Sequence, residues 1–149
     1  MIAWKYINKT SATIAALRDY NNMRFVFNNI PDEIKEMHAS MTAPRSSNLS
    51  GMPSVHNPQA GEGELVAQID KLDILWGSYY QAIDYMAWFE PAWTALTDTE
   101  RHILAEFYMG ENLKSGATYR LVQQLNYSES HVERLRSSAL SRLQTLLFG

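Results

Sequence analysis

The sequence predicts an all-α protein, and three features carry that prediction. Apolar residues recur at alternating three- and four-residue spacing along two long stretches, which places them on one face of a helix. A segment rich in proline, glycine and serine, residues 40–63, separates the two stretches and is interpreted as a flexible linker. After residue 95, helix-capping residues alternate with short apolar periods. We therefore expect a helical hairpin over residues 1–95 and a bundle of shorter helices over residues 96–149.

The composition supports a folded chain and excludes several functional classes. Hydrophobic residues make up 46% of the 149 residues and charged residues 19%, which is enough apolar material for a core. The chain has no cysteine, which excludes disulfides, thiol catalysis and cysteine-ligated zinc. No apolar run approaches the roughly 20 residues that span a bilayer, and no signal-peptide layout is present. We expect a cytoplasmic protein that makes no contact with membranes.

The two long stretches carry the same apolar pattern. Its spacing averages about 3.5 residues, which is typical of a coiled-coil seam. Two such seams joined by a linker indicate either an antiparallel hairpin within one chain or a pairing between the chains of a homodimer. The members are Ala16, Tyr20, Met23, Phe27, Ile30, Ile34, Met37 and Met41 before the linker, and Leu65, Ile69, Leu72, Trp76, Tyr79, Ile83 and Met86 after it.

Two prolines are expected to interrupt these helices. Pro31 would kink the first helix or open a new one, because its ring removes a backbone donor. Glu90 precedes Pro91, so the second helix is expected to end near Phe89 and a short helix to begin at Pro91. Three aromatic residues nearby are interpreted as core or seam packing rather than as a platform for stacking bases: Trp76, Trp88 and Trp93.

From Leu96 onward the local signals predict short helices. Thr97 followed by Glu100 is a capping box, in which the hydroxyl and the carboxylate each accept a backbone N–H. Gly110 is expected to end this helix in the left-handed conformation, and Thr118 to cap the next. The apolar faces of these two helices comprise Leu96, Ile103, Leu104, Phe107 and Tyr108, then Leu121, Val122 and Leu125.

A tight turn then leads into a longer helix over residues 128–147. Asn126 stands at the turn, and asparagine tolerates the left-handed conformation better than most residues. Ser128 is expected to cap the longer helix. A short helix, a turn and a longer helix match the helix-turn-helix plan, in which the second helix enters the DNA major groove. The predicted inner face of that helix comprises Val132, Leu135, Ala139, Leu140, Leu143, Leu146 and Leu147.

These segments also resemble a known family. LTDTERHILAEFYMG followed by LVQQLNYSESHVERLRSSALSRL, within residues 96–143, resembles region 4 of bacterial sigma factors. Over its full length the chain is similar to phage-encoded late-transcription regulators of the autolysin regulatory (ArpU-like) family, which also place a linker such as Ser50-Gly51-Met52-Pro53 before a sigma-like C-terminus. The resemblance implies a sequence-specific DNA-binding regulator of transcription. Its implied partners are duplex DNA and RNA polymerase.

The resemblance also implies roles for single residues. Ser128 corresponds to the residue that caps the recognition helix, and the first turns of that helix read bases. Arg134 is a candidate for bidentate contact with guanine, although a surface ion pair with Glu129 or Glu133 fits as well. The candidate DNA-binding residues are Thr118, Ser128, Glu129, Ser130, His131, Glu133 and Arg134, with possible phosphate contacts at Lys114, Arg120, Arg136 and Arg142.

Several departures from the sigma pattern leave the DNA target open. Ser130 stands where sigma factors commonly have an acidic residue, and Glu133 and Arg134 stand where Arg-Gln is common. Residues 96–149 hold six Lys and Arg against six Asp and Glu, whereas residues 1–95 have a net charge of −3. These features also fit an alternative class: a helical protein–protein interaction module whose helix-turn-helix shape is not used on DNA.

Little in the sequence points to catalysis. His102 and Glu106 are spaced to share one helix face, as metal ligands can be, but no further ligand recurs nearby at a diagnostic spacing. With four histidines and no cysteine, a nucleophilic constellation has little material. We expect no enzymatic activity, no metal and no cofactor.

Overall fold

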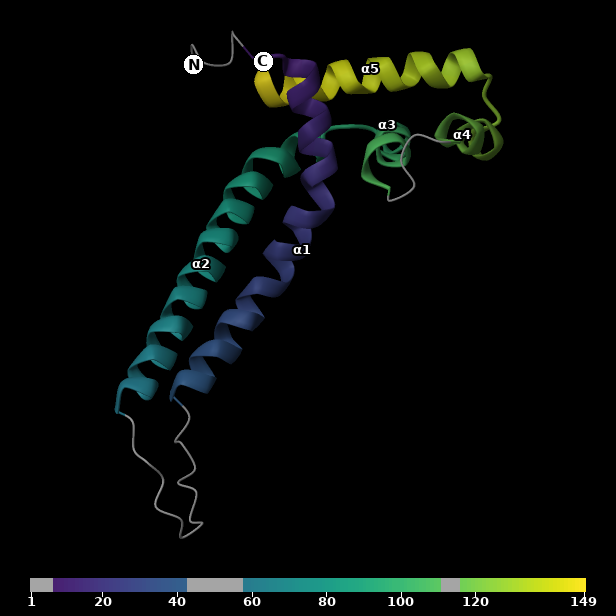
Figure 1. Ribbon diagram of the computed structural model, residues 1–149. Helices are drawn as coiled ribbons and strands as arrows, with labels where there is room; N and C mark the ends of the chain where they lie inside the picture. The colour runs from purple at the N-terminus through teal and green to yellow at the C-terminus, as the bar shows by residue number, and fades with distance from the viewer. Residues whose placement is uncertain (1–6, 43–57, 111–115) are drawn as a thin grey trace. The chain divides into compact units, whose positions relative to one another are not determined.

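The computed structural model describes residues 7–42, 58–110 and 116–149, and it confirms the all-α prediction (Figure 1). Every regular element in these ranges is helical. None of the described helices combines the length and the apolar character needed to cross a membrane. The elements are α1 (Lys9–Thr42), α2 (Pro58–Thr94), α3 (Asp98–Leu104), a π-helical turn η2 (Ala105–Met109), α4 (Ala117–Leu125) and α5 (Glu129–Phe148).

The chain divides into two compact units, and α1 and α2 each contribute to both. The core unit combines the start of α1, up to Arg24, with the chain from Asp84 to Gly149. The hairpin unit is Phe25–Ile83. The division falls within the long helices rather than after residue 95, because buried residues near the end of α2 share one apolar core with the shorter helices.

Aromatic packing organises the core unit. Phe89 is fully buried, and its ring lies against those of Tyr85 and Trp93 at centroid distances of 5.2 and 5.8 Å. Trp88 joins α2 to the end of α5, because its indole Nε1 donates to the backbone carbonyl of Leu147 at 3.3 Å. The interpretation of Trp88 and Trp93 as core residues is therefore confirmed.

In the hairpin unit, α1 and α2 run antiparallel and side by side (Figure 1). Ile30 and Ile34 of α1 are buried, as the predicted seam requires. Within residues 62–83 of α2, only Ala82 is buried. The two helices therefore share a narrow contact and leave much of α2 exposed.

The register of that contact on α2 differs from the prediction. Leu65 and Ile69, which the sequence places in the seam, are 44% and 42% exposed, so the predicted seam is wrong at these two positions. Phe27 of α1 is 37% exposed, but its ring still meets that of Tyr79 at 6.2 Å. Apolar residues occupy more than one face of α2, and the face that includes Leu75 and Tyr79 is the more buried one.

Neither proline ends a helix. α1 continues through Pro31 and α2 through Pro91, so the expected helix end near Phe89 is wrong. A proline inside a helix costs about 3 kcal/mol in lost hydrogen bonding and steric clash. Phe89 and Ala92 are both buried, so the apolar contacts of α2 continue across Pro91 and offset that cost.

The helices also extend into the segment that the sequence assigns to the linker. α1 continues to Thr42, and α2 begins at Pro58. Part of the predicted linker, 40–63, is therefore helical. Residues 43–57, which include the linker motif at 50–53, lie outside the described residues.

Two tyrosine hydroxyls are bound within the core unit. The Tyr85 hydroxyl donates to the backbone carbonyl of Ala16 at 2.5 Å, and the Tyr20 hydroxyl donates to Glu90 Oε2 at 3.3 Å. Burial, followed by the negative charge of Asp19, raises the pKa of Tyr85 far above its ordinary range. Burial and the carboxylate of Glu90 also raise the pKa of Tyr20. Both phenols are therefore held in the neutral form.

Phe89→Ala tests the role of the aromatic core. We expect it to lower the free energy of unfolding by about 3–5 kcal/mol, because a fully buried ring is replaced by a cavity. Urea unfolding followed by circular dichroism measures the change. Phe25→Ala is the matched control, since Phe25 is 61% exposed, and its effect should stay within about 0.5 kcal/mol. Equal losses for the two variants would contradict this account of the core.

Tyr85→Phe tests the buried phenol through the pH dependence of stability. A raised pKa means that the stabilisation is fully present below the pKa of the unfolded chain, about 10, and is lost as the pH rises through the folded value. We expect the native protein to lose stability more steeply than Tyr85→Phe above pH ~10. Urea unfolding at a series of alkaline pH values gives the two slopes, and identical slopes would exclude Tyr85 as the cause.

Candidate nucleic-acid interface

At the start of α3, one of the two hydrogen bonds of the predicted capping box is formed. Thr97 Oγ1 accepts the backbone N–H of Glu100 at 3.3 Å, as expected. The described structure contains no return bond from the Glu100 carboxylate to Thr97. Glu100 Oε1 instead accepts from Arg142 of α5 at 2.9 Å, which ties α3 to α5. A side chain predicted to serve one helix end therefore links two helices.

The connection into α4 differs from the sequence prediction at two residues. Gly110 is extended, with φ −85° and ψ 153°, and is not left-handed. Gly116 is the N-cap of α4 and has φ +82°, a conformation that glycine adopts without strain. Thr118 lies inside the first turn, so its predicted capping role is wrong. Its Oγ1 donates to Glu133 Oε1 at 3.3 Å and thereby joins α4 to α5.

The turn between α4 and α5 follows the prediction. Asn126 is left-handed, with φ 57° and ψ 34°, and is the one non-glycine residue with positive φ in the described ranges. Ser128 caps α5, because its Oγ accepts the backbone N–H of His131 at 3.2 Å. The Tyr127 ring meets the His131 ring edge to face at 4.6 Å. Together these contacts fix the first turn of α5.

One side of α5 is buried along the whole helix. Val132 and Leu143 are fully buried, and Leu147 is 8% exposed. Leu146 is 45% exposed, so its predicted place on the inner face is wrong. Adjacent residues of a helix point about 100° apart, so Leu146 and Leu147 cannot both face the core squarely. The burial of this stripe sets the rotation of α5.

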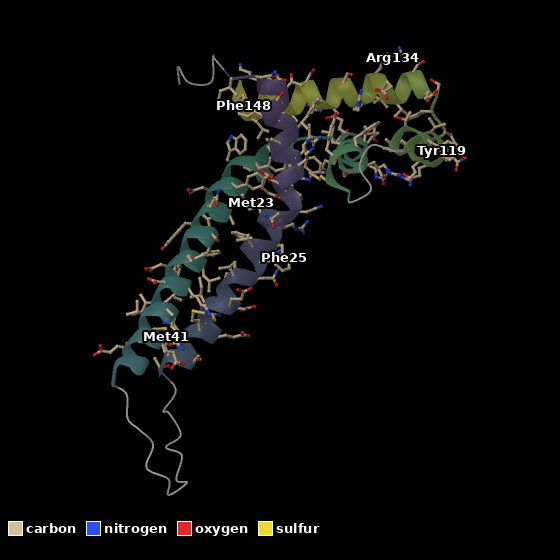
Figure 2. All side chains as sticks on the ribbon, in the orientation of Figure 1. Met23, Phe25, Met41, Tyr119, Arg134 and Phe148 are labelled. Atoms are coloured by element: carbon tan, nitrogen blue, oxygen red, sulfur yellow. The ribbon has the colours of Figure 1, made fainter. Side chains whose placement is uncertain are left out.

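The opposite side of α5 exposes several of the predicted DNA-binding residues. Glu129, Ser130 and Arg134 are exposed, and His131 is half-buried. Figure 2 shows Arg134 on the side of α5 that faces away from α4. Among the described residues, no hydrogen bond or ion pair engages its guanidinium. The ion pair of Arg134 with Glu129 or Glu133, which the sequence left open, is therefore not formed.

Glu133 has other partners. Its Oε2 atom pairs with Arg136 at 2.6 Å, and its Oε1 atom accepts from Thr118 of α4. The Arg136 guanidinium also lies over the Phe107 ring, 4.9 Å from its centroid. Thr118, Glu133 and Arg136 thus form a network that connects α4, α5 and η2. Within this network, the negative charge of Glu133 faces a cation of its own chain.

Two further predicted phosphate contacts also have carboxylate partners. Arg120 of α4 pairs with Glu106 of η2 at 3.1 Å. Arg142 pairs with Glu100, and it donates to the backbone carbonyl of Ala95 at 3.2 Å. Each pair joins two elements of the core unit, so a phosphate at these positions would have to compete with a carboxylate. The remaining candidate, Lys114, lies outside the described residues.

Two aromatic side chains near the turn were not among the predicted site residues. Tyr119 of α4 is 66% exposed and Tyr127 is 38% exposed. Gln123 Nε2 donates to the Tyr119 hydroxyl at 2.7 Å, one helical turn away. The sequence pattern could have predicted this exposure, because Tyr119 and Gln123 stand one helical turn apart on a face that does not include the buried Leu121. Figure 2 shows Tyr119 at the surface of α4.

The residues with metal-ligand spacing are engaged by protein groups. The His102 Nε2 atom lies 2.8 Å from Gln124 Oε1, and Glu106 pairs with Arg120. Within the part of the chain that the structure describes, no group of three or more His, Asp or Glu side chains is placed to hold a metal ion.

Comparisons with protein-family models, with curated proteins and with solved structures find no match to this chain. The likeness to sigma-factor region 4 therefore stays a prediction from the sequence, and the assignment of a function depends on the geometry of α4 and α5.

Asn126→Ala tests the turn that precedes α5. We expect a loss of about 1–2 kcal/mol in the free energy of unfolding, because alanine is strained in the left-handed conformation that Asn126 adopts. Asn126→Gly is the matched control and should be at least as stable as the native protein. Thermal unfolding of both variants gives the order. If alanine were tolerated as well as glycine, the turn would not need a left-handed residue.

Proposed function

We propose that this chain binds duplex DNA and regulates transcription, with the first two turns of α5 in the major groove. The observation that carries the proposal is Arg134, an exposed cation without an intramolecular partner among the described residues, on a helix whose start is firmly fixed. It stands beside the exposed Ser130, four residues earlier on the same face.

The geometry of α5 suits recognition of base edges. A capped helix end and a buried stripe along the other side hold the exposed face in one orientation. The guanidinium of Arg134 can donate two parallel hydrogen bonds to guanine, and the hydroxyl of Ser130 can donate or accept. The N-terminus of α5 also favours a nearby phosphate through its free backbone N–H groups.

Charge pairing inside the core unit sets the expected strength of binding. The contacts of Glu133 with Arg136 and Thr118 reduce the repulsion that a free carboxylate would exert on DNA. The same pairing engages Arg136, which would otherwise be free to contact a phosphate. With six basic and six acidic residues over 96–149, binding should be moderate and should weaken with added salt.

The wider role is proposed from the resemblance. Similarity to sigma-factor region 4 and to phage-encoded late regulators suggests action at promoters, directly on RNA polymerase or beside it. The long helices of residues 1–95 would serve for dimerisation or for contact with a protein partner. A sedimentation measurement that finds a monomer at high protein concentration would exclude the homodimer.

An interaction module that does not use DNA is the second candidate. The observation in its favour is that Arg120, Arg136 and Arg142 all pair with carboxylates. In that case the cations would stabilise the helical bundle, and α5 would present its exposed face to a protein.

Arg134→Ala tests the DNA-binding proposal. A pool of genomic fragments is first titrated with the native protein at low and moderate salt, and the enriched fragment becomes the probe. We expect Arg134→Ala to weaken binding by about 1–3 kcal/mol, which is the worth of one bidentate base contact. Adding His131→Ala should weaken it further. Fluorescence anisotropy with the labelled fragment measures both changes.

Arg18→Ala is the matched control for charge. Arg18 is an exposed cation of α1 in the same unit, and its removal should leave the affinity nearly unchanged. If no fragment is enriched and no salt-dependent binding appears, the DNA proposal fails and the interaction module remains. If DNA binds but both Arg134 variants keep full affinity, DNA contacts another surface.

A further inference from the structure

α2 carries a second apolar face that the described chain leaves largely exposed. Leu65, Val66, Ile69 and Tyr80 are 44%, 57%, 42% and 59% exposed. Their spacing places them on one side of the helix together with Trp76, roughly a third of a turn away from the residues that pack on α1. We call these five residues the outer stripe. Scattered single apolar residues are normal on a surface, but five apolar residues on one side of a helix are typical of an interaction site.

An aromatic pair stands in this stripe. The rings of Trp76 and Tyr80 are stacked, with centroids 5.5 Å apart. Tyr79, the neighbour of Tyr80, contacts Phe27 of α1 and so belongs to the packed side of the helix. Tyr80, which is 59% exposed, therefore offers ring surface to the outside, whereas Trp76 is half-buried and its ring also meets that of Tyr79 at 6.2 Å. Aromatic faces of this kind attract cations, and arginine above all.

Gly77 borders the outer stripe, between the two aromatic residues along the chain. A Cβ atom added there would meet nothing within 4 Å, so no neighbour in the described chain uses the space. Glycine in a helix interior weakens the helix relative to alanine, so intramolecular packing gives no reason for it here. A helix without a side chain at this point does allow the backbone of a partner to approach closely.

The charges around the outer stripe are acidic. Residues 25–83 hold seven Asp and Glu against three Lys and Arg, a net charge of −4, while the rest of the chain has a net charge of +1. Glu62 and Asp73 share the side of α2 that carries the stripe. A second copy of this unit, a nucleic acid or an anionic lipid surface would each be repelled. A positively charged partner would be attracted.

From these observations we infer that the outer stripe of α2 binds a basic amphipathic helix of a protein partner. Apolar residues of that helix cover Leu65, Ile69 and Tyr80, and its arginines contact the Trp76 and Tyr80 rings and Asp73. The site shares no residue with the DNA-binding face proposed for α5. It can therefore be tested without DNA, and its failure would leave the DNA-binding proposal intact.

The test uses two synthetic helical peptides that share a leucine face. One carries arginine at its flanking positions, and its twin carries glutamate. Isothermal titration into the full chain should show binding of the arginine peptide alone, with an affinity that falls as salt is added. Binding of both peptides alike, or of neither, would overturn the inference.

Gly77→Gln tests close approach directly. Glutamine is a better helix former than glycine, so the variant should have a higher Tm than the native protein. At the same time it should weaken binding of the arginine peptide at least about tenfold, by blocking contact with the stripe. Ile74→Gln is the matched control, because Ile74 is 68% exposed on another face of α2, and it should keep the affinity within about twofold.

Two further outcomes would overturn the inference. In the first, Gly77→Gln binds the arginine peptide as well as the native chain does, which would show that the stripe is not the contact surface. In the second, sedimentation finds that the native chain self-associates and that Gly77→Gln is a monomer, which would assign the stripe to a second copy.

Discussion

Burial of one side of α5 is the constraint on which the core unit depends. Val132, Ala139, Leu143 and Leu147 form a stripe that runs the length of the helix and lies in the apolar core. At the far end of α5, Trp88 of α2 contacts the backbone at Leu147. Because the stripe is held along its whole length, α5 cannot rotate without losing several buried side chains at once. The exposed side is therefore as well defined as the buried side.

All but one of the arginines of α4 and α5 form ion pairs with carboxylates of the same unit. Arg120, Arg136 and Arg142 of α4 and α5 pair with carboxylates. The pairs of Arg120 and Arg142 and the contact of Arg136 with the Phe107 ring connect neighbouring elements. Exposed ion pairs contribute little stability one by one, but two of these also connect α4 to η2 and α5 to α3. Arg134 is the cation of α5 that these pairs leave out. Arg134 stays free to bind a ligand because no carboxylate of the described chain lies within ion-pair distance of its guanidinium.

The two compact units differ in charge and in how completely their apolar residues are covered. The core unit buries aromatic and aliphatic side chains from every one of its helices. The hairpin unit has only two helices in the described chain, so α2 keeps an uncovered apolar side in an acidic setting. A two-helix unit cannot enclose its apolar residues as a bundle does, because each helix has one neighbour. This incomplete burial is the physical basis of the partner contact proposed for the outer stripe.

Local chemistry in the sequence determined the helix starts at Thr97 and Ser128 and the turn at Asn126. Their side-chain hydrogen bonds and tolerance of positive φ act within a few residues, so they can be predicted without the fold. Tertiary packing decided the rest. Pro91 should end a helix, yet buried neighbours on both sides keep α2 continuous. The capped start of α5 thus follows from the sequence, whereas the fold decides that Arg134 stays unpaired. Thr118 of α4 donates to Glu133 only once α4 and α5 have packed, and the other carboxylate oxygen of Glu133 pairs with Arg136.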